Sequence, residues 1–131
     1  MYDRNKSLEE LEADYRTKSG FDSGLVTISE SLFQKPLSEF TVENLRILIG
    51  QNIGLKFLIP IAIEHLEENL FVQGDYYPGD LLWSVLSIEP DYWNEYPENY
   101  WKIRELTGGL SSIFSKLNTA IKKFEQIKLL N

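Results

Sequence analysis

Along most of this 131-residue chain, apolar residues recur every three or four positions, which is the spacing of one face of an α-helix. The clearest case runs from Leu55 to Leu70, where the 3.6-residue period continues through Pro60. Proline cannot donate a backbone hydrogen bond, so this helix either begins close to Pro60 or bends there. No stretch alternates with period two for long enough to predict a sheet.

Residues that favour helix ends divide the first half of the chain. Ser7 followed by Glu10 has the form of a capping box before a short first helix. Further on, Thr41 is placed to cap a third helix, for which Gly50 offers a stop.

A second helix is predicted between these two. Apolar side chains recur at helical spacing over residues 25–33 until Pro36 ends the pattern, and Ser23 is placed to cap it. The overlapping stretch GLVTIS (24–29) is the best strand candidate in the sequence, and we rank it below the helix.

Turn residues and prolines divide the second half. GDYYPGDLL (74–82) reads as a turn, with Asp80 placed to cap a helix over residues 81–88. Pro90 and Pro97 each suit the first turn of a helix, so they predict a short helix followed by the start of a long one.

The C-terminal pattern keeps spacings of three and four from Ile103 to Phe124, across Gly108-Gly109. Either the helix continues through the glycines with a kink, or it breaks and Ser111 or Ser112 caps a new one. Periodicity favours continuity, whereas the low helix propensity of glycine favours a break. We therefore predict an all-α fold of six or seven helices around one core, the longest helix at the C-terminus.

Composition adds limits to this fold. The length suits one domain over residues 1–131, and the 43% apolar and 25% charged fractions are those of a globular protein. The sequence has no cysteine, which excludes disulfides and thiol chemistry and favours a reducing cytosol. The N-terminus lacks the apolar segment of a secretion signal, and polar residues interrupt the most apolar stretch, residues 47–63, so we expect a cytoplasmic protein without a membrane span.

Charge is distributed unevenly along the chain. The net charge is −7, and residues 57–101 contain nine acidic residues and no Lys or Arg, whereas residues 102–131 contain six basic and two acidic residues. Nucleic-acid binding depends on Lys and Arg that neutralise phosphates, so this balance argues against it.

The sequence offers little for catalysis. His65 is the only histidine, so a two-histidine metal motif is excluded, and we interpret it as a helix-surface residue. Carboxylate pairs such as Asp75 with Asp80, or Glu64 with Glu68, could in principle serve a hydrolase, but no spacing rule selects one. Calcium loops and phosphate-binding glycine motifs are absent. We predict no enzymatic activity, no cofactor and no metal.

The unusual stretch is EPDYWNEYPENYW, residues 89–101, with five aromatic and four acidic residues and no basic one. We expect Trp83, Trp93 and Trp101 to be buried because of their size. Tyrosine hydroxyls need water or a polar partner, and tyrosines are frequent at binding hot spots. The missing counter-charge is then supplied by another molecule, and a nuclease, whose cleft must be basic, is a natural candidate.

The predicted contact residues combine carboxylates, which would meet Lys or Arg of the partner, with tyrosines, which would supply contact area. They are Asp75, Tyr76, Tyr77, Asp91, Tyr92, Glu95, Tyr96 and Glu98.

Three stretches carry a family resemblance. KSLEELEADY (6–15), KPLSEFTVENLRILIGQNIGLKFLIPIAIEHLEEN (35–69) and GDYYPGDLLWSVL (74–86) resemble the CdiI immunity proteins of bacterial contact-dependent growth inhibition (CDI). The resemblance covers roughly residues 6–101. It implies a cytosolic, non-catalytic protein that binds the C-terminal toxin domain of a cognate CdiA effector, often a nuclease. It names neither the toxin nor any contact residue.

The leading hypothesis is therefore an immunity protein that occludes the active site of a toxin domain. The alternative is an acidic adaptor or nucleic-acid mimic that occupies a basic surface of an unrelated host protein. A carboxylate hydrolase is a third reading, which rests only on the abundance of acids. The sequence leaves the oligomeric state open.

Overall fold

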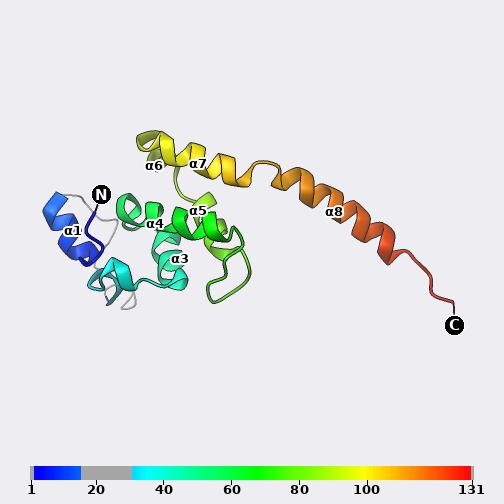
Figure 1. Cartoon of the computed structure of the whole chain (residues 1–131), viewed down its shortest axis with the longest axis horizontal. Helices are drawn as coiled ribbons and strands as arrows, with labels where there is room; N and C mark the ends of the chain where they lie inside the picture. Colours follow the sequence, from blue (N-terminus) through cyan, green and yellow to red (C-terminus); the bar gives the residue numbers. More distant parts are fainter. Residues whose placement is uncertain (1, 16–30, 131) are drawn as a thin grey trace.

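The computed structural model describes residues 2–15 and 31–130 (Figure 1). Within these ranges the regular structure is helical, apart from two isolated β-bridges, so the predicted all-α fold is confirmed. The elements are α1 (Leu8–Tyr15), the 3₁₀ helix η1 (Leu37–Glu39), α3 (Val42–Gly50), α4 (Leu55–Glu68), α5 (Asp80–Leu86), α6 (Pro90–Glu95), α7 (Pro97–Thr107) and α8 (Leu110–Glu125).

The second predicted helix lies mostly outside the described residues. Its cap Ser23, its first apolar positions and the alternative strand GLVTIS all fall within residues 16–30. Residues 31–33 are helical, and Leu32 is buried.

The helix caps predicted at Ser7 and Thr41 are both present. The backbone N–H of Glu10 donates to Ser7 Oγ at 3.2 Å, and the N–H of Ser7 donates to the Glu10 carboxylate at 3.1 Å. At α3 the same exchange joins Thr41 and Asn44, with both distances 3.1 Å. The caps satisfy backbone donors at each helix start that would otherwise lack partners.

Helix α4 lies at the centre of the core. It packs against α3, α5 and α7, and the helix runs through Pro60. Its buried residues include the consecutive runs 57–59 and 61–63, so its apolar surface extends round most of the helix, as in a helix that has neighbours on several sides. The buried side chains of α4 are Phe57, Leu58, Ile59, Ile61, Ala62, Ile63 and Leu66.

The chain breaks between α7 and α8, which decides between the two alternatives that the sequence left open at Gly108-Gly109. Gly109 adopts a left-handed conformation with φ 87° and precedes the first residue of α8, so neither Ser111 nor Ser112 is the cap. A left-handed residue costs glycine little, and helix propensity therefore outweighed periodicity at this point.

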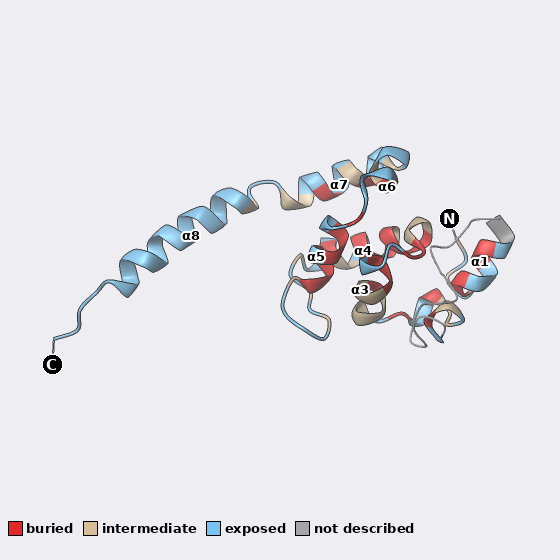
Figure 2. Cartoon of the chain, turned by 180° about the vertical axis from the view of Figure 1, so that it is seen from behind, coloured by how far each residue is buried: buried red, intermediate tan, exposed pale blue. Residues whose placement is uncertain are grey.

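Helix α8 differs from the other helices in its surroundings. It is the longest helix among the described elements, with 16 residues, and none of them is buried. It extends away from the body of the molecule and is exposed along its length (Figures 1 and 2). The single core therefore comprises the elements up to α7, with Leu106 and Leu110 packed at its edge.

None of the helices in the described part of the chain is long and apolar enough to cross a membrane.

Candidate functional site

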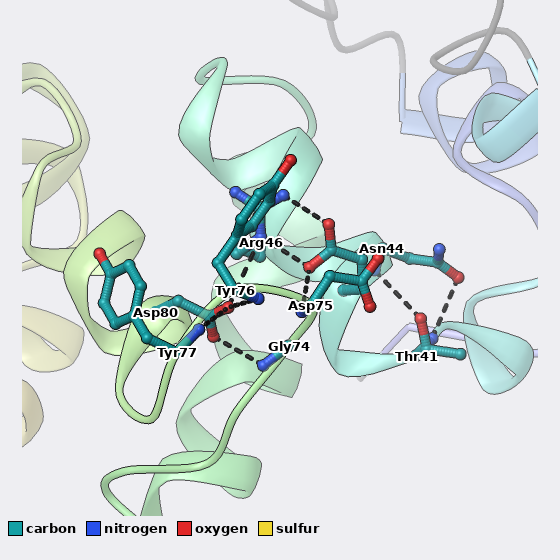
Figure 3. Close-up of polar contacts among 9 residues, drawn as sticks. Thr41, Asn44, Arg46, Gly74, Asp75, Tyr76, Tyr77 and Asp80 are labelled. Carbon is teal, nitrogen blue, oxygen red and sulfur yellow. Dashed lines mark hydrogen bonds and ion pairs between the residues drawn. The ribbon is translucent and has the colours of Figure 1, made fainter.

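A loop between α4 and α5 displays two of the predicted tyrosines. We call residues 74–78 the tyrosine loop. Asp80, the first residue of α5, holds it together, because its carboxylate accepts backbone N–H bonds from Gly74 at 2.7 Å, Tyr76 at 3.1 Å and Tyr77 at 3.4 Å (Figure 3). The prediction that Asp80 caps its own helix is wrong, since Gly79 is the cap residue. The carboxylate orders the preceding loop instead.

Two residues of α3 attach the tyrosine loop to the core. Glu43 accepts the backbone N–H of Asp75 at 2.9 Å and the Nε–H of Arg46 at 2.6 Å. The Arg46 guanidinium lies 4.5 Å from the centre of the Tyr76 ring, within cation–π distance, and its Nε is 3.9 Å from Asp80 (Figure 3). The loop is thus held from both sides before any partner arrives.

The charges beneath the loop are mutually compensated. Burial alone would raise the pKa of Asp80, but its three backbone donors and the nearby Arg46 together lower it. The hydrogen bond from Arg46 lowers the pKa of Glu43. Arg46 supplies a counter-charge to Asp80. The hypothesis that acids in this region lack an internal counter-charge is therefore wrong for Asp80.

Exposure differs among the predicted residues of the tyrosine loop. Tyr76 is 70% exposed and Tyr77 is 45% exposed, while Asp75 is exposed as well. An ordered backbone therefore presents two large rings and one carboxylate to solvent, at little further cost in conformational entropy on binding.

The second group of predicted residues lies on α6 and α7. Here Tyr92 belongs to the core: only 7% of it is exposed, and its hydroxyl accepts a bond from Asn99 Nδ2 at 3.0 Å. Burial raises the pKa of its hydroxyl, and the Tyr96 ring stacks on it with the ring centres 4.8 Å apart. Because its ring is enclosed, we withdraw Tyr92 from the predicted contact residues.

The three carboxylates of this second group are directed to solvent. Asp91, Glu95 and Glu98 are all exposed, and no ion pair reaches them from any residue that the structure describes. The same holds for Asp75, and in particular the lysines of α8 form no ion pair with these acids. These four acids are therefore not neutralised by an ion pair, although α7 also carries Lys102 and Arg104 in its second half.

A cleft lies beside these acids. It has a volume of about 600 Å³, and we call it the aromatic cleft. It lies between the end of α5 and helices α6 and α7, which also carry the three carboxylates. Its lining residues are Leu86, Ile88, Pro90, Trp93, Asn94, Pro97 and Tyr100.

Two tryptophans that we predicted as core are on the surface. Trp83 is 62% exposed and Trp101 is 61% exposed, whereas Trp93 is partly buried against the core, so the prediction is wrong for the first two. A signal was present for Trp83, because Leu81, Leu82 and Val85 already fill the buried face of the short helix α5. Trp83 falls on its other face, together with Leu86, which is 54% exposed.

The structure does not bring all the predicted residues together. The tyrosine loop lies on one side of α5, while α6 and α7 lie on the other (Figures 1 and 2). Trp83 and Leu86 belong to the exposed side of the helix between them. A partner that touched both groups would therefore have to extend along α5.

The structure gives no support to the catalytic hypotheses considered from the sequence. Among the described residues there is no cluster of three or more His, Asp or Glu side chains that could hold a metal ion. Of the carboxylate pairs considered for hydrolysis, Asp80 is buried under the tyrosine loop, and Glu64 forms an ion pair with Arg4. The exposed groups are suited to binding.

Comparison with known proteins gives one match. The model of the family of CDI immunity proteins matches residues 9–103, which is more than two thirds of the chain. Neither a curated protein nor a solved structure matches the chain. The matched segment begins in α1 and ends in α7, so it contains the buried core apart from Leu8, the tyrosine loop and the aromatic cleft, while α8 lies beyond it. The chain therefore belongs to the family of CDI immunity proteins, which neutralise toxins.

Proposed function

We propose that this immunity protein binds the C-terminal toxin domain of its cognate CdiA effector through α6, α7 and the aromatic cleft. The toxin is a nuclease with a cationic active site, and the bound immunity protein occludes that site. The observation that carries the proposal is a set of exposed carboxylates, Asp91, Glu95 and Glu98, that lie on the helices lining the cleft and form no ion pair with any described residue.

The carboxylates and the aromatic cleft contribute to binding in different ways. The carboxylates attract Lys and Arg of the toxin and speed association, an effect that salt screens. The cleft accepts an apolar or aromatic side chain of the toxin, which supplies most of the affinity because it leaves water completely. Tyr96 contributes the exposed part of its side chain, which is only partly buried.

The tyrosine loop forms a second contact. Asp75, Tyr76 and Tyr77 stand on a backbone that Asp80 and Glu43 already hold, so binding need not order it. Together with Trp83 and Leu86 on α5, it extends the interface towards the standard size of about 1,600 Å².

Inhibition by this route requires no catalysis by the immunity protein. The protein acts stoichiometrically in the cytoplasm, where a nuclease toxin would meet its substrate. One immunity protein occupies one toxin domain, and both RNA and DNA are excluded from the complex by the like charge of the immunity protein.

The experiment is a titration of the cognate toxin domain with charge-reversed immunity protein. We expect the triple variant Asp91→Lys, Glu95→Lys, Glu98→Lys to bind at least 100-fold more weakly, about 3 kcal/mol, because three attractions become repulsions. The thermal unfolding of its monomer differs little from that of a wild-type monomer, although Asp91 and Glu98 stand in first helical turns, where Lys costs about 0.5 kcal/mol each.

A matched control keeps the change in net charge but moves it elsewhere. Glu9, Glu39 and Glu68 are exposed acids on other elements, and their reversal to Lys leaves the affinity within a few-fold of wild type. Equal loss in both triple variants would mean that only net charge matters. Full affinity in the α6–α7 variant would contradict the proposed site.

A further inference from the structure

Helix α8 has an apolar face that is largely uncovered by the described residues. Its residues recur at spacings of three and four on one side of the helix, and each is about half exposed or more. Near its start α8 contacts the body, where Phe71 and Phe114 have ring centres 6.2 Å apart. The exposed members of this face are Ile113, Phe114, Leu117, Ile121 and Phe124.

This exposure is costly for an isolated helix. A 16-residue helix is marginal in water without packing, and most helical stability in proteins comes from burial of the apolar face. Continuous exposed apolar surface of this kind marks an interaction site. The question is therefore which molecule covers α8.

The positive charge of α8 indicates that its partner is acidic. Its polar flanks carry Lys116, Lys122 and Lys123 against one acid, Glu125. The cationic toxin of the proposed function has the wrong sign for this helix. Residues 57–101 of the protein itself have the right sign, with nine acids and no Lys or Arg.

The same acidic segment also has room for apolar side chains. The aromatic cleft of about 600 Å³ lies beside Asp91, Glu95 and Glu98, whose charges have no ion pair within the described chain. The apolar face of α8 is therefore complementary to the cleft, and its lysines are complementary to the acids beside the cleft. The match is not made within one chain, because α8 extends away from the body (Figures 1 and 2).

We propose that the free protein forms a two-fold dimer in which α8 of each copy lies across α6 and α7 of the other. The apolar face of α8 covers the aromatic cleft, and its lysines face Asp91, Glu95 and Glu98. A two-fold axis repeats each contact, so one association event buries two helices and two clefts. Gly108-Gly109 sets the direction in which α8 leaves its own copy.

The dimer places a second copy on the surface that we assign to the toxin. Toxin and second copy then compete, and toxin binding releases α8. The inference itself depends only on the self-complementary surface, so it can be tested without toxin and can fail separately from the proposed function.

The first test is the mass of the free protein in solution, measured by light scattering as it leaves a sizing column. We expect wild type to have the mass of two 15.2 kDa chains. The variant Leu117→Asp, Ile121→Asp has the mass of one. The control variant Ser115→Asp, Thr119→Asp has the same spacing on the opposite face of α8 and remains dimeric.

A charge exchange identifies the surface that α8 contacts. Lys116 and Lys123 are seven residues apart on one edge of the apolar face, and their reversal to Glu yields a monomer. The variant Asp91→Lys, Glu95→Lys, Glu98→Lys is also monomeric on its own. An equimolar mixture of the two variants forms a heterodimer, because both contacts then join opposite charges.

Two results would overturn the inference. One is a wild-type protein with the mass of a single chain at every concentration. The other is a dimer that survives reversal of the α6–α7 acids, which would mean that α8 pairs with α8 or with another surface.

Discussion

Helices α4 and α8 have the same apolar periodicity and opposite surroundings. Of the 14 residues of α4, seven are buried, whereas none of the 16 residues of α8 is. Both helices have apolar residues three and four apart, but in α4 the runs 57–59 and 61–63 extend the apolar surface round most of the helix, whereas in α8 it is a single stripe. The difference teaches that periodicity shows which face of a helix seeks cover, while the cover itself depends on neighbours and on other molecules.

Carboxylates in this molecule show the same contrast. Asp80 is 2% exposed and accepts three backbone N–H bonds, whereas Asp91 is exposed and has no ion pair within the described chain. A buried, hydrogen-bonded carboxylate such as Asp80 stabilises the fold, and an exposed carboxylate such as Asp91 is available to a partner. Matched substitutions at the two kinds of position distinguish stabilisation from binding.

The largest expected effect comes from leucines on the two helices. Leu58→Ala in α4 removes a fully buried side chain and lowers the free energy of unfolding by about 3 kcal/mol. Leu117→Ala in α8 changes it by less than about 0.5 kcal/mol when both substitutions are made in the monomeric variant Lys116→Glu, Lys123→Glu. Denaturant unfolding monitored by circular dichroism measures both. Equal losses would mean that α8 packs on the body.

The two aspartates should differ by somewhat less. Asp80→Ala leaves three backbone donors without an acceptor, so we expect a loss of about 2–3 kcal/mol and a more mobile tyrosine loop. Asp91→Ala costs about 0.5 kcal/mol or less, from its place in the first turn of α6. A stable Asp80→Ala variant would contradict the role that we assign to this carboxylate.

The glycines before the two helices form a third pair. Gly54 and Gly109 are both left-handed, with φ 65° and 87°, so alanine is strained at either position. A Cβ at Gly54 would also meet the methyl groups of Leu8 at 3.0 Å, whereas one at Gly109 meets nothing. Gly54→Ala should lower global stability by about 2 kcal/mol.

Gly109→Ala should leave the global unfolding midpoint unchanged, because the strain falls on a helix outside the core. Faster amide exchange in α8 reports that strain. A fall in the midpoint would instead show that α8 belongs to the cooperative unit of the monomer.

The smallest expected effect is on pH dependence. The pKa of Asp80 in the folded chain lies below its ordinary value of 3.8, so its contribution to stability is present above that value. It is lost as pH falls through the lowered folded pKa, and Glu43 behaves in the same way below 4.5. In Asp80→Asn the acid-induced loss of stability is therefore shallower, as thermal melts at decreasing pH would show. Parallel profiles would count against this assignment.

Local sequence rules predicted most of the fold. The caps at Ser7 and Thr41, the prolines at the starts of α6 and α7 and the central apolar helix all act through neighbours within four residues. The break at Gly108-Gly109 was decided between two local rules, and the intrinsic preference of glycine outweighed the period.

The surface was harder to predict because it depends on contacts distant in sequence. Asp80 turns back to the tyrosine loop, and Arg46 on α3 supplies its counter-charge, which spacing along the chain does not reveal. Trp83 and Trp101 are exposed although size favours burial, because the short helices already have their buried faces filled by other residues. Large side chains left outside in this way are the strongest sign of a binding surface.

Hydrogen–deuterium exchange on the toxin complex tests the central claim most directly. We expect addition of the cognate toxin domain to slow exchange in α6, α7 and the tyrosine loop of the monomeric Leu117→Asp, Ile121→Asp variant. The exposed side of α1 should be unaffected. Protection confined to α1 or α3, with residues 89–101 unchanged, would contradict the account.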